Sequence, residues 1–127
     1  MTYQFGKSSL AKLRTTHPQC QEVLLEAIEN SPIDFGVSSG LRTAEEQYQL
    51  YCDGKSQLDG HNNLSNHQSG GAVDVFAYVD GKASYDREHL SMVAGVILST
   101  AERLEVEMGW GGHWESFTDM PHFELVR

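Results

Sequence analysis

The spacing of apolar residues predicts two core-building helices. Pro18 suits the first position of a helix, and the apolar side chains after it recur at helical spacing until Ser31-Pro32; they are Cys20, Val23, Leu24, Ala27 and Ile28. A second stripe predicts the longest helix, which Asp86 can cap; its members are Leu90, Val93, Ala94, Ile97, Leu98, Ala101 and Leu104. We expect both helices to bury these stripes and to carry no chemistry.

Two shorter helices are predicted from capping signals. Ser8 or Ser9 can cap a helix that ends near residue 15. Thr43, with Glu46 three residues later, forms a capping-box pattern that predicts a helix over residues 44–52, and Gly54 can close its C-terminus. The polar segment 55–66 has no periodicity and is predicted to be a loop.

Short strand-like runs complete the pattern, at residues 33–38, 72–79, 106–110 and 122–126. Asp80-Gly81 is a hairpin-turn signal, so residues 82–85 are expected to pair with the strand before them. The order of the elements, without a repeat or a linker, predicts one domain over residues 1–127. Its class should be α+β, a small and mainly antiparallel sheet packed with helices.

The charge balance narrows the possible partners. The chain of 127 residues carries 9 Lys+Arg against 18 Asp+Glu, a formal net charge of −9. We therefore expect neither nucleic acid nor an anionic membrane as a partner. Separately, we expect a monomer. No segment is apolar enough for a signal peptide or a transmembrane helix, which predicts synthesis in the cytoplasm. Cys20 and Cys52 are interpreted as two reduced thiols.

Two short segments carry the candidate chemistry. His67 lies seven residues before Asp74, and Asp119 lies three residues before His122. Two His and one Asp suit a zinc ion with an open fourth position, which is typical of catalytic zinc. On one regular strand His67 and Asp74 would face opposite ways, but Gly70-Gly71 permits a sharp turn between them. Asp119 is then available as a base for a water on the metal.

The roles of several other polar residues stay open at this level. Glu124 shares a strand face with His122, so it either orients that imidazole or is a solvated charge. Arg42 is either a surface residue or a guanidinium that clamps a substrate carboxylate or a developing oxyanion. Gln47 follows about one helical turn later, and its chemistry alone favours a solvated side chain. The remaining histidines are expected to be structural or exposed; they are His17, His61, His89 and His113.

Taken together, these residues resemble a known family. The pattern Ser65-x-His67-x-x-Gly70-x-Ala72-x-Asp74 with Asp119-x-x-His122 is similar to the VanY-type zinc D-Ala-D-Ala carboxypeptidases and their L-alanyl-D-glutamate endopeptidase relatives. Ser39-Gly40-x-Arg42-Thr43 and Trp110-Gly111-Gly112-x-Trp114 extend the resemblance. The segments around Phe5 and Phe35 resemble single-domain phage endolysins. The resemblance implies a hedgehog-like α+β zinc peptidase that cuts the stem peptides of peptidoglycan.

The resemblance also implies residue roles. It makes His67, Asp74 and His122 the ligands of one zinc ion, Asp119 the general base, Arg42 the clamp for substrate or oxyanion, and Ser65 and Gln47 residues near the substrate. Two positions depart from the family pattern. His113 stands where many relatives carry Asp, and we expect it to shape its loop rather than bind metal. The base is the shorter Asp119 where the carboxypeptidase branch commonly has Glu.

The resulting hypothesis is an endolysin that cuts the L-Ala–D-Glu bond of bacterial stem peptides and lyses the host. It would be made in the host cytoplasm without a signal peptide and would act on the periplasmic wall after release by a separate membrane-disrupting protein. One alternative is a D-Ala-D-Ala carboxypeptidase acting on peptidoglycan precursors. Another is a catalytically silent, zinc-stabilised binding module; Asp119 argues against it, because a structural zinc site needs no free carboxylate beside its ligands.

Overall fold

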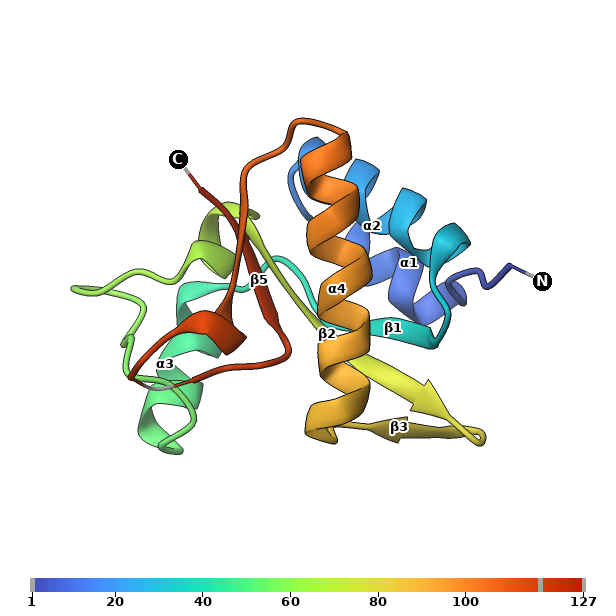
Figure 1. Cartoon of the computed structure of the whole chain (residues 1–127). Coiled ribbons are helices and arrows are strands. Elements are labelled where there is room, and N and C mark those ends of the chain that lie inside the picture. The colour runs from blue at the N-terminus through green and yellow to red at the C-terminus, as the bar shows by residue number, and fades with distance from the viewer. Residues whose placement is uncertain (1, 117, 127) are drawn as a thin grey trace.

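The computed structural model describes residues 2–116 and 118–126, in which helices and strands are interspersed along the chain (Figure 1). The elements are α1 (Lys7–Leu13), α2 (Pro18–Asn30), β1 (Asp34–Ser39), α3 (Ala44–Cys52), the 3₁₀ helix η1 (Asn66–Ser69), β2 (Ala72–Val79), β3 (Lys82–Ser84), α4 (Arg87–Arg103), β4 (Met108–Trp110), the 3₁₀ helix η2 (Gly111–His113) and β5 (His122–Leu125). The predicted α+β class is confirmed.

The strands form one sheet in the order β1-β2-β5-β4, with β3 paired to β2, and each of these pairs is antiparallel. Figure 1 shows α1, α2 and α4 grouped on one side of β2 and β5, and α3 with the following loop on the other. The sheet centre is thus the boundary between a helical layer and a region of loops. No helix in the described part of the chain is both long and apolar enough to cross a bilayer.

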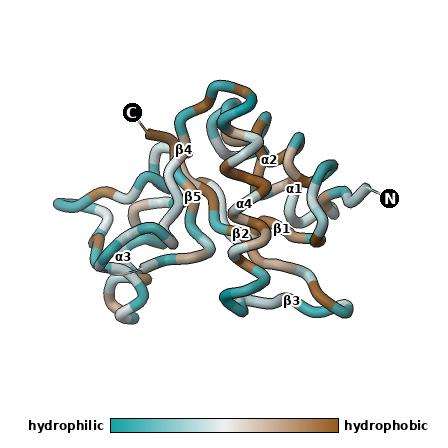
Figure 2. The backbone as a smooth tube through the Cα atoms, in the orientation of Figure 1, coloured by the Kyte–Doolittle hydropathy of each residue, from teal (hydrophilic) through white to brown (hydrophobic). Residues whose placement is uncertain are grey.

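The hydrophobic core lies where α2 and α4 meet the sheet. Figure 2 shows hydrophobic positions gathered at this junction. Both predicted helical stripes contribute to it, and the side chains below 2 % exposure include Val23, Leu24, Val93, Ile97, Val73, Val75 and Phe123. Burial of this apolar area is the dominant stabilising term, roughly 25 cal/mol for each Å² removed from water. Cys20 lies in this core, whereas Cys52 is exposed.

Local signals explain how the helices begin. Thr43 Oγ1 accepts a hydrogen bond from the N–H of Glu46, and the N–H of Thr43 donates to the Glu46 carboxylate, so the predicted capping box is present. At α2, Pro18 occupies the first turn as predicted, and Nδ1 of His17 accepts a hydrogen bond from the N–H of Gln19. His17 therefore caps a helix.

The predicted start of α1 is wrong. The N-cap is Gly6, and the helix ends at Leu13 rather than near residue 15. The reason is tertiary: Ser9 is buried, and its Oγ accepts a hydrogen bond from the N–H of Val37 in β1 at 3.0 Å. The hydroxyl that suggested a helix cap instead joins α1 to the sheet.

Two further differences concern short elements. The strand predicted over residues 72–79 is confirmed as β2, whereas the other strands are shorter or shifted by one or two residues; for example, the predicted strand 106–110 is Met108–Trp110. Both 3₁₀ helices lie in segments predicted without helix, because three or four residues are too few to show a periodicity. The first of them, η1, carries His67 and so matters directly for the site.

Candidate metal centre

The position of His67 is set by a short capped turn. Ser65 Oγ accepts a hydrogen bond from the N–H of His67 at 3.2 Å, and the Gln68 side chain accepts one from the N–H of Ser65 at 2.9 Å. Gly70 then closes η1 with φ of 79°, a left-handed conformation that glycine adopts without strain. The predicted sharp turn between His67 and β2 is therefore present.

The sheet register brings together the other two candidate ligands. Asp74 of β2 lies directly opposite His122 of β5 in the antiparallel ladder. Residues opposite one another in such a ladder have their Cβ atoms about 4.5–5.5 Å apart on the same face. Asp74 and His122, far apart in sequence, are thus held side by side by backbone pairing, and η1 places His67 next to them.

The three side chains form a compact triangle. Nε2 of His67 lies 3.2 Å from Oδ1 of Asp74 and 3.2 Å from Nδ1 of His122, and Nδ1 of His122 lies 3.1 Å from the same Asp74 oxygen. Ligand atoms held tetrahedrally at about 2.0–2.1 Å from one ion lie about 3.3 Å from one another. The spacing of the triangle therefore fits a small divalent cation at its centre.

Hydrogen bonds on the outer ring nitrogens orient both imidazoles. Nδ1 of His67 lies 2.9 Å from the carbonyl oxygen of Gly40, and Nε2 of His122 lies 2.7 Å from a carboxylate oxygen of Glu124. A carbonyl and an ionised carboxylate only accept, so these two nitrogens carry the protons. The lone pairs of His67 Nε2 and His122 Nδ1 then face the centre together with Asp74.

The electrostatics of the triangle also favour a cation. Burial alone would raise the pKa of Asp74, but hydrogen bonds to His122 and His67 and their charge hold that pKa well below its usual range. Burial lowers the pKa of His122, yet the hydrogen bond and charge of Asp74, followed by the bond to Glu124, raise it above its ordinary value. Without a metal, a second proton on His122, carried by Nδ1, thus partly offsets the crowded acceptor atoms, and a metal ion would take the place of that proton.

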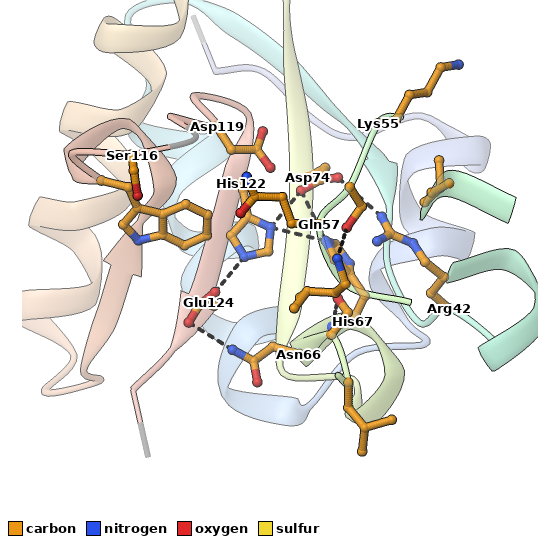
Figure 3. A pocket seen from close by; sticks show the side chains of 16 residues that line it. Arg42, Lys55, Gln57, Asn66, His67, Asp74, Ser116, Asp119, His122 and Glu124 are labelled. Atoms are coloured by element: carbon orange, nitrogen blue, oxygen red, sulfur yellow. Dashed lines mark hydrogen bonds and ion pairs between the residues drawn. The ribbon is translucent and has the colours of Figure 1, made fainter. Parts of the chain in front are cut away.

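Asp119 lies beside this triangle and is positioned through its backbone. Its N–H donates to the carbonyl of Gly111 at 3.0 Å, and its own carbonyl accepts from the N–H of His122 at 3.1 Å. A Cβ at Gly111 would collide with the Asp119 carbonyl, so the close approach requires glycine. Burial first, and the charge of Asp74 next, raise the pKa of Asp119. Its carboxylate lines the same cleft as the triangle (Figure 3).

The guanidinium of Arg42 also reaches the triangle and is held by three hydrogen bonds. Its guanidinium donates to Gln47 Oε1 at 2.7 Å, to Ser39 Oγ at 3.1 Å and to the second oxygen of Asp74 at 3.5 Å. Burial lowers the pKa of Arg42, and the charges of Asp74, Glu46 and Asp119 oppose that shift. The guanidinium is charged at neutral pH. The surface reading of Arg42 is therefore wrong.

Gln47 and Ser65 are both buried. The expectation of a solvated Gln47 is wrong: its side chain is 0 % exposed, and its Nε2 donates to Ser56 Oγ and to the carbonyl of Leu58. Gln47 therefore links the Arg42 guanidinium to the loop that follows α3. Ser65 lines the cleft while its Oγ caps η1.

The other histidines lie outside the triangle. His113 packs edge-on against Trp110, with ring centroids 4.9 Å apart, and lines a different hollow of the surface. His61 contacts the ring of Tyr48, and His89 is hydrogen-bonded to Ser84. In the described part of the chain, the group able to hold a metal consists of His67, Asp74 and His122.

The structure adds residues that the sequence did not single out. Asn66 Nδ2 donates to the Glu124 carboxylate at 2.8 Å, and the same carboxylate bonds to His122. Glu124 is therefore a residue that orients His122 rather than a solvated charge. The triangle lies in a cleft of about 460 Å³, whose walls include Lys55 and Trp114. Nothing in the spacing of Asn66 or Lys55 along the chain points to this cleft, and the sequence indicates Trp114 only as part of the motif Trp110-Gly111-Gly112-x-Trp114.

Comparison with known proteins gives one consistent result. Residues 1–126 match the family described as phage L-alanyl-D-glutamate peptidase. The L-alanyl-D-glutamate peptidase of Escherichia phage T5 is 32 % identical over 128 residues, covering 100 % of this chain and 92 % of that protein. The peptidoglycan L-alanyl-D-glutamate endopeptidase CwlK of Bacillus subtilis is 30 % identical over 124 residues, covering 87 % of this chain and 73 % of CwlK.

A solved structure agrees in three dimensions. The crystal structure of the L-Ala D-Glu endopeptidase ChiX of Serratia marcescens superposes with a TM-score of 0.88 at 32 % sequence identity. The match covers 98 % of this chain and 91 % of ChiX. The match therefore shows that the whole fold is shared with ChiX.

Proposed function

This chain belongs to the phage L-alanyl-D-glutamate peptidase family, and from that premise we propose that it hydrolyses the L-Ala–D-Glu bond of peptidoglycan with one zinc ion held by His67, Asp74 and His122. The observation that carries the proposal is the triangle of ligand atoms, whose separations of 3.1–3.2 Å suit tetrahedral coordination. Residues 1–127 would act as one catalytic domain and as a monomer.

Zinc is favoured by the donor set. Two imidazole nitrogens and one carboxylate oxygen are the ligands of many catalytic zinc sites, whereas magnesium and calcium prefer oxygen donors alone. When bound, zinc supplies a Lewis acid that lowers the pKa of a water and polarises the scissile carbonyl.

The remaining chemistry belongs to residues of the chain. Asp119, whose pKa is raised by burial, accepts the proton of the attacking water and returns it to the leaving amine of D-Glu. Arg42 points its guanidinium toward the triangle and stabilises the oxyanion that forms on the carbonyl. Ser65 and Gln47 support this arrangement near the substrate, Ser65 through η1 and Gln47 through Arg42.

A paired variant experiment tests this assignment. Asp119→Asn keeps the side-chain size but removes the base, so we expect the rate to fall by roughly 10²–10⁴-fold while zinc stays bound. His113→Ala is the matched control, since His113 faces a different hollow, and it should keep both zinc and most activity. The measurements are turnover of purified muropeptides and metal content of the purified protein.

The reaction products identify which bond of the stem peptide is cleaved. Mass spectrometry should find stem peptides with a new D-Glu amino terminus. Loss of a single terminal alanine, without such stems, would instead indicate carboxypeptidase activity. If Asp119→Asn lost its zinc but retained turnover when zinc was supplied in excess, Asp119 would be a ligand rather than the base.

A further inference from the structure

The two sides of the cleft differ in chemistry. Figure 3 shows Arg42 and Lys55 on one side of the triangle, and Ser116 and Glu124 on the other. Among the described residues that line the cleft, Arg42 and Lys55 are the only Lys or Arg. Trp114 belongs to the opposite side, where its ring centroid lies 5.1 Å from that of His122. A ligand with one anionic and one neutral half would therefore meet a different surface at each end.

Trp114 presents an aromatic surface on a hydrogen-bonded loop. Its backbone N–H donates to the carbonyl of Gly111 at 3.2 Å, and its backbone carbonyl accepts from Thr118 Oγ1 at 2.9 Å. The residue is 38 % exposed although it touches a candidate metal ligand. An indole that packs against His122 on such a loop offers a large apolar contact to a ligand.

Lys55 is the cation that remains available to a ligand. The guanidinium of Arg42 is already bonded to Gln47, Ser39 and Asp74 beside the reaction centre. Lys55 is exposed and follows the left-handed Gly54 at the end of α3, where its N–H donates to the carbonyl of Leu50. Within the described residues, no ion pair joins its ammonium to a carboxylate.

The substrate has the same asymmetry. In peptidoglycan the amine of L-Ala is acylated by the lactyl group of a muramic acid, so this half is neutral and carries a saccharide. The D-Glu residue continues the stem through its side-chain carboxyl and leaves its α-carboxylate free, next to the scissile nitrogen. One residue spans at most about 3.6 Å, so the saccharide lies within roughly 10 Å of the reacting carbonyl. Both halves must therefore contact the walls of the cleft.

We propose that the substrate crosses the triangle in one direction, with the muramoyl saccharide against Trp114 and the α-carboxylate of D-Glu toward Lys55. This rests on the proposed function. The reverse direction would place the D-Glu carboxylate near the Glu124 carboxylate and leave Lys55 unpaired, an arrangement that like-charge repulsion disfavours. Lys55 and Trp114 are thus specificity-determining residues for the two ends of the same substrate.

Four soluble substrates test the direction: the stem peptide with or without the muramoyl saccharide, each with D-Glu or with its α-carboxamide D-isoglutamine. For each enzyme, kcat/KM gives one ratio for the saccharide and one for the carboxylate. In Trp114→Ala we expect the saccharide ratio to fall by about tenfold and the carboxylate ratio to stay constant. In Lys55→Gln the carboxylate ratio should fall by about three- to tenfold, and the saccharide ratio should not change.

Conservative variants and controls keep the test decisive. Trp114→Phe should recover most of the saccharide ratio and Lys55→Arg most of the carboxylate ratio, whereas a general loss of structure would move both ratios or neither. Circular dichroism and zinc content check each variant, and His113→Ala should alter neither ratio. An exchange of the two effects would establish the opposite direction and overturn the proposal, as would ratios that do not respond. If the unaltered protein cleaves none of the four substrates, the proposed function itself fails.

Discussion

Glu124→Ala is predicted to weaken metal binding without removing a ligand. The Glu124 carboxylate accepts from Nε2 of His122 at 2.7 Å and from Nδ2 of Asn66 at 2.8 Å. The first bond keeps the proton on Nε2, so that Nδ1 of His122 presents its lone pair to the metal. The second bond joins β5 to η1 and so ties the segment of His122 to the segment of His67. Alanine removes both effects at once.

The size of the effect follows from these contacts. Loss of an outer partner of a metal-bound histidine typically lowers metal affinity by about 10- to 100-fold, or roughly 1.4–2.7 kcal/mol. The Glu124 side chain is 26 % exposed, so water partly screens its charge and can replace its hydrogen bonds. We therefore expect a loss close to tenfold. Glu124→Gln keeps one oxygen acceptor and should lose less.

Two measurements check the reasoning. Zinc affinity is obtained by competition with a chelator at constant pH, with Glu107→Ala as the matched control because Glu107 is exposed and does not line the cleft. Nitrogen NMR of the metal-free protein, at a pH high enough for His122 to be neutral, reports which nitrogen of His122 carries the proton, and Glu124→Ala should lose the preference for Nε2. Affinity within twofold of the unaltered protein, together with an unchanged proton position, would refute the argument.

Two other perturbations follow from the same geometry. Removal of metal by a chelator should lower the Tm, because three acceptor atoms 3.1–3.2 Å apart then face one another without a cation. With free zinc at about 100 times its Kd, zinc binding adds about 2.7 kcal/mol to the free energy of unfolding. A Tm that calorimetry finds unaffected by zinc would contradict this. Gly111→Ala should lower kcat by at least about tenfold while zinc remains bound, because the added Cβ displaces the backbone of Asp119. Its control is Gly95→Ala on the exposed side of α4, where nothing lies within 4 Å of an added Cβ. Equal rates in the two variants would show that Asp119 is not positioned through Gly111.

Much of the fold was predictable because its signals are local. The bounds of α3 agree with the capping box at Thr43, and α2 begins at Pro18 as its special backbone geometry predicts. The stripe on α4 became part of the core. Such signals lie within one or two turns of the residues that they organise, so they can be read from a single sequence.

The sequence was misleading or silent where a side chain forms a hydrogen bond with another segment of the chain. Ser9 has the chemistry of a helix cap but bonds to β1, 28 residues away. Gln47 has the chemistry of a solvated amide but bonds to Arg42 and to the loop after α3. Asn66 and Glu124 meet across 58 residues. Propensity and spacing carry no information on such pairs, because each depends on how complete elements are packed.

The predicted triad residues came together because the core determines their register. Val73 and Phe123, both 0 % exposed, lie opposite one another in the β2–β5 ladder, and Asp74 lies opposite His122 one position further along. Side chains alternate along a strand, so a slip by one residue would turn Val73 or Phe123 out of the core and Asp74 or His122 into it. Either exchange would bury an unpaired polar group and expose apolar area, which is strongly unfavourable. The apolar face of these strands therefore specifies the position of the metal-binding face. Among the three candidate ligands, only His67 is placed by a separate feature, the turn at Gly70.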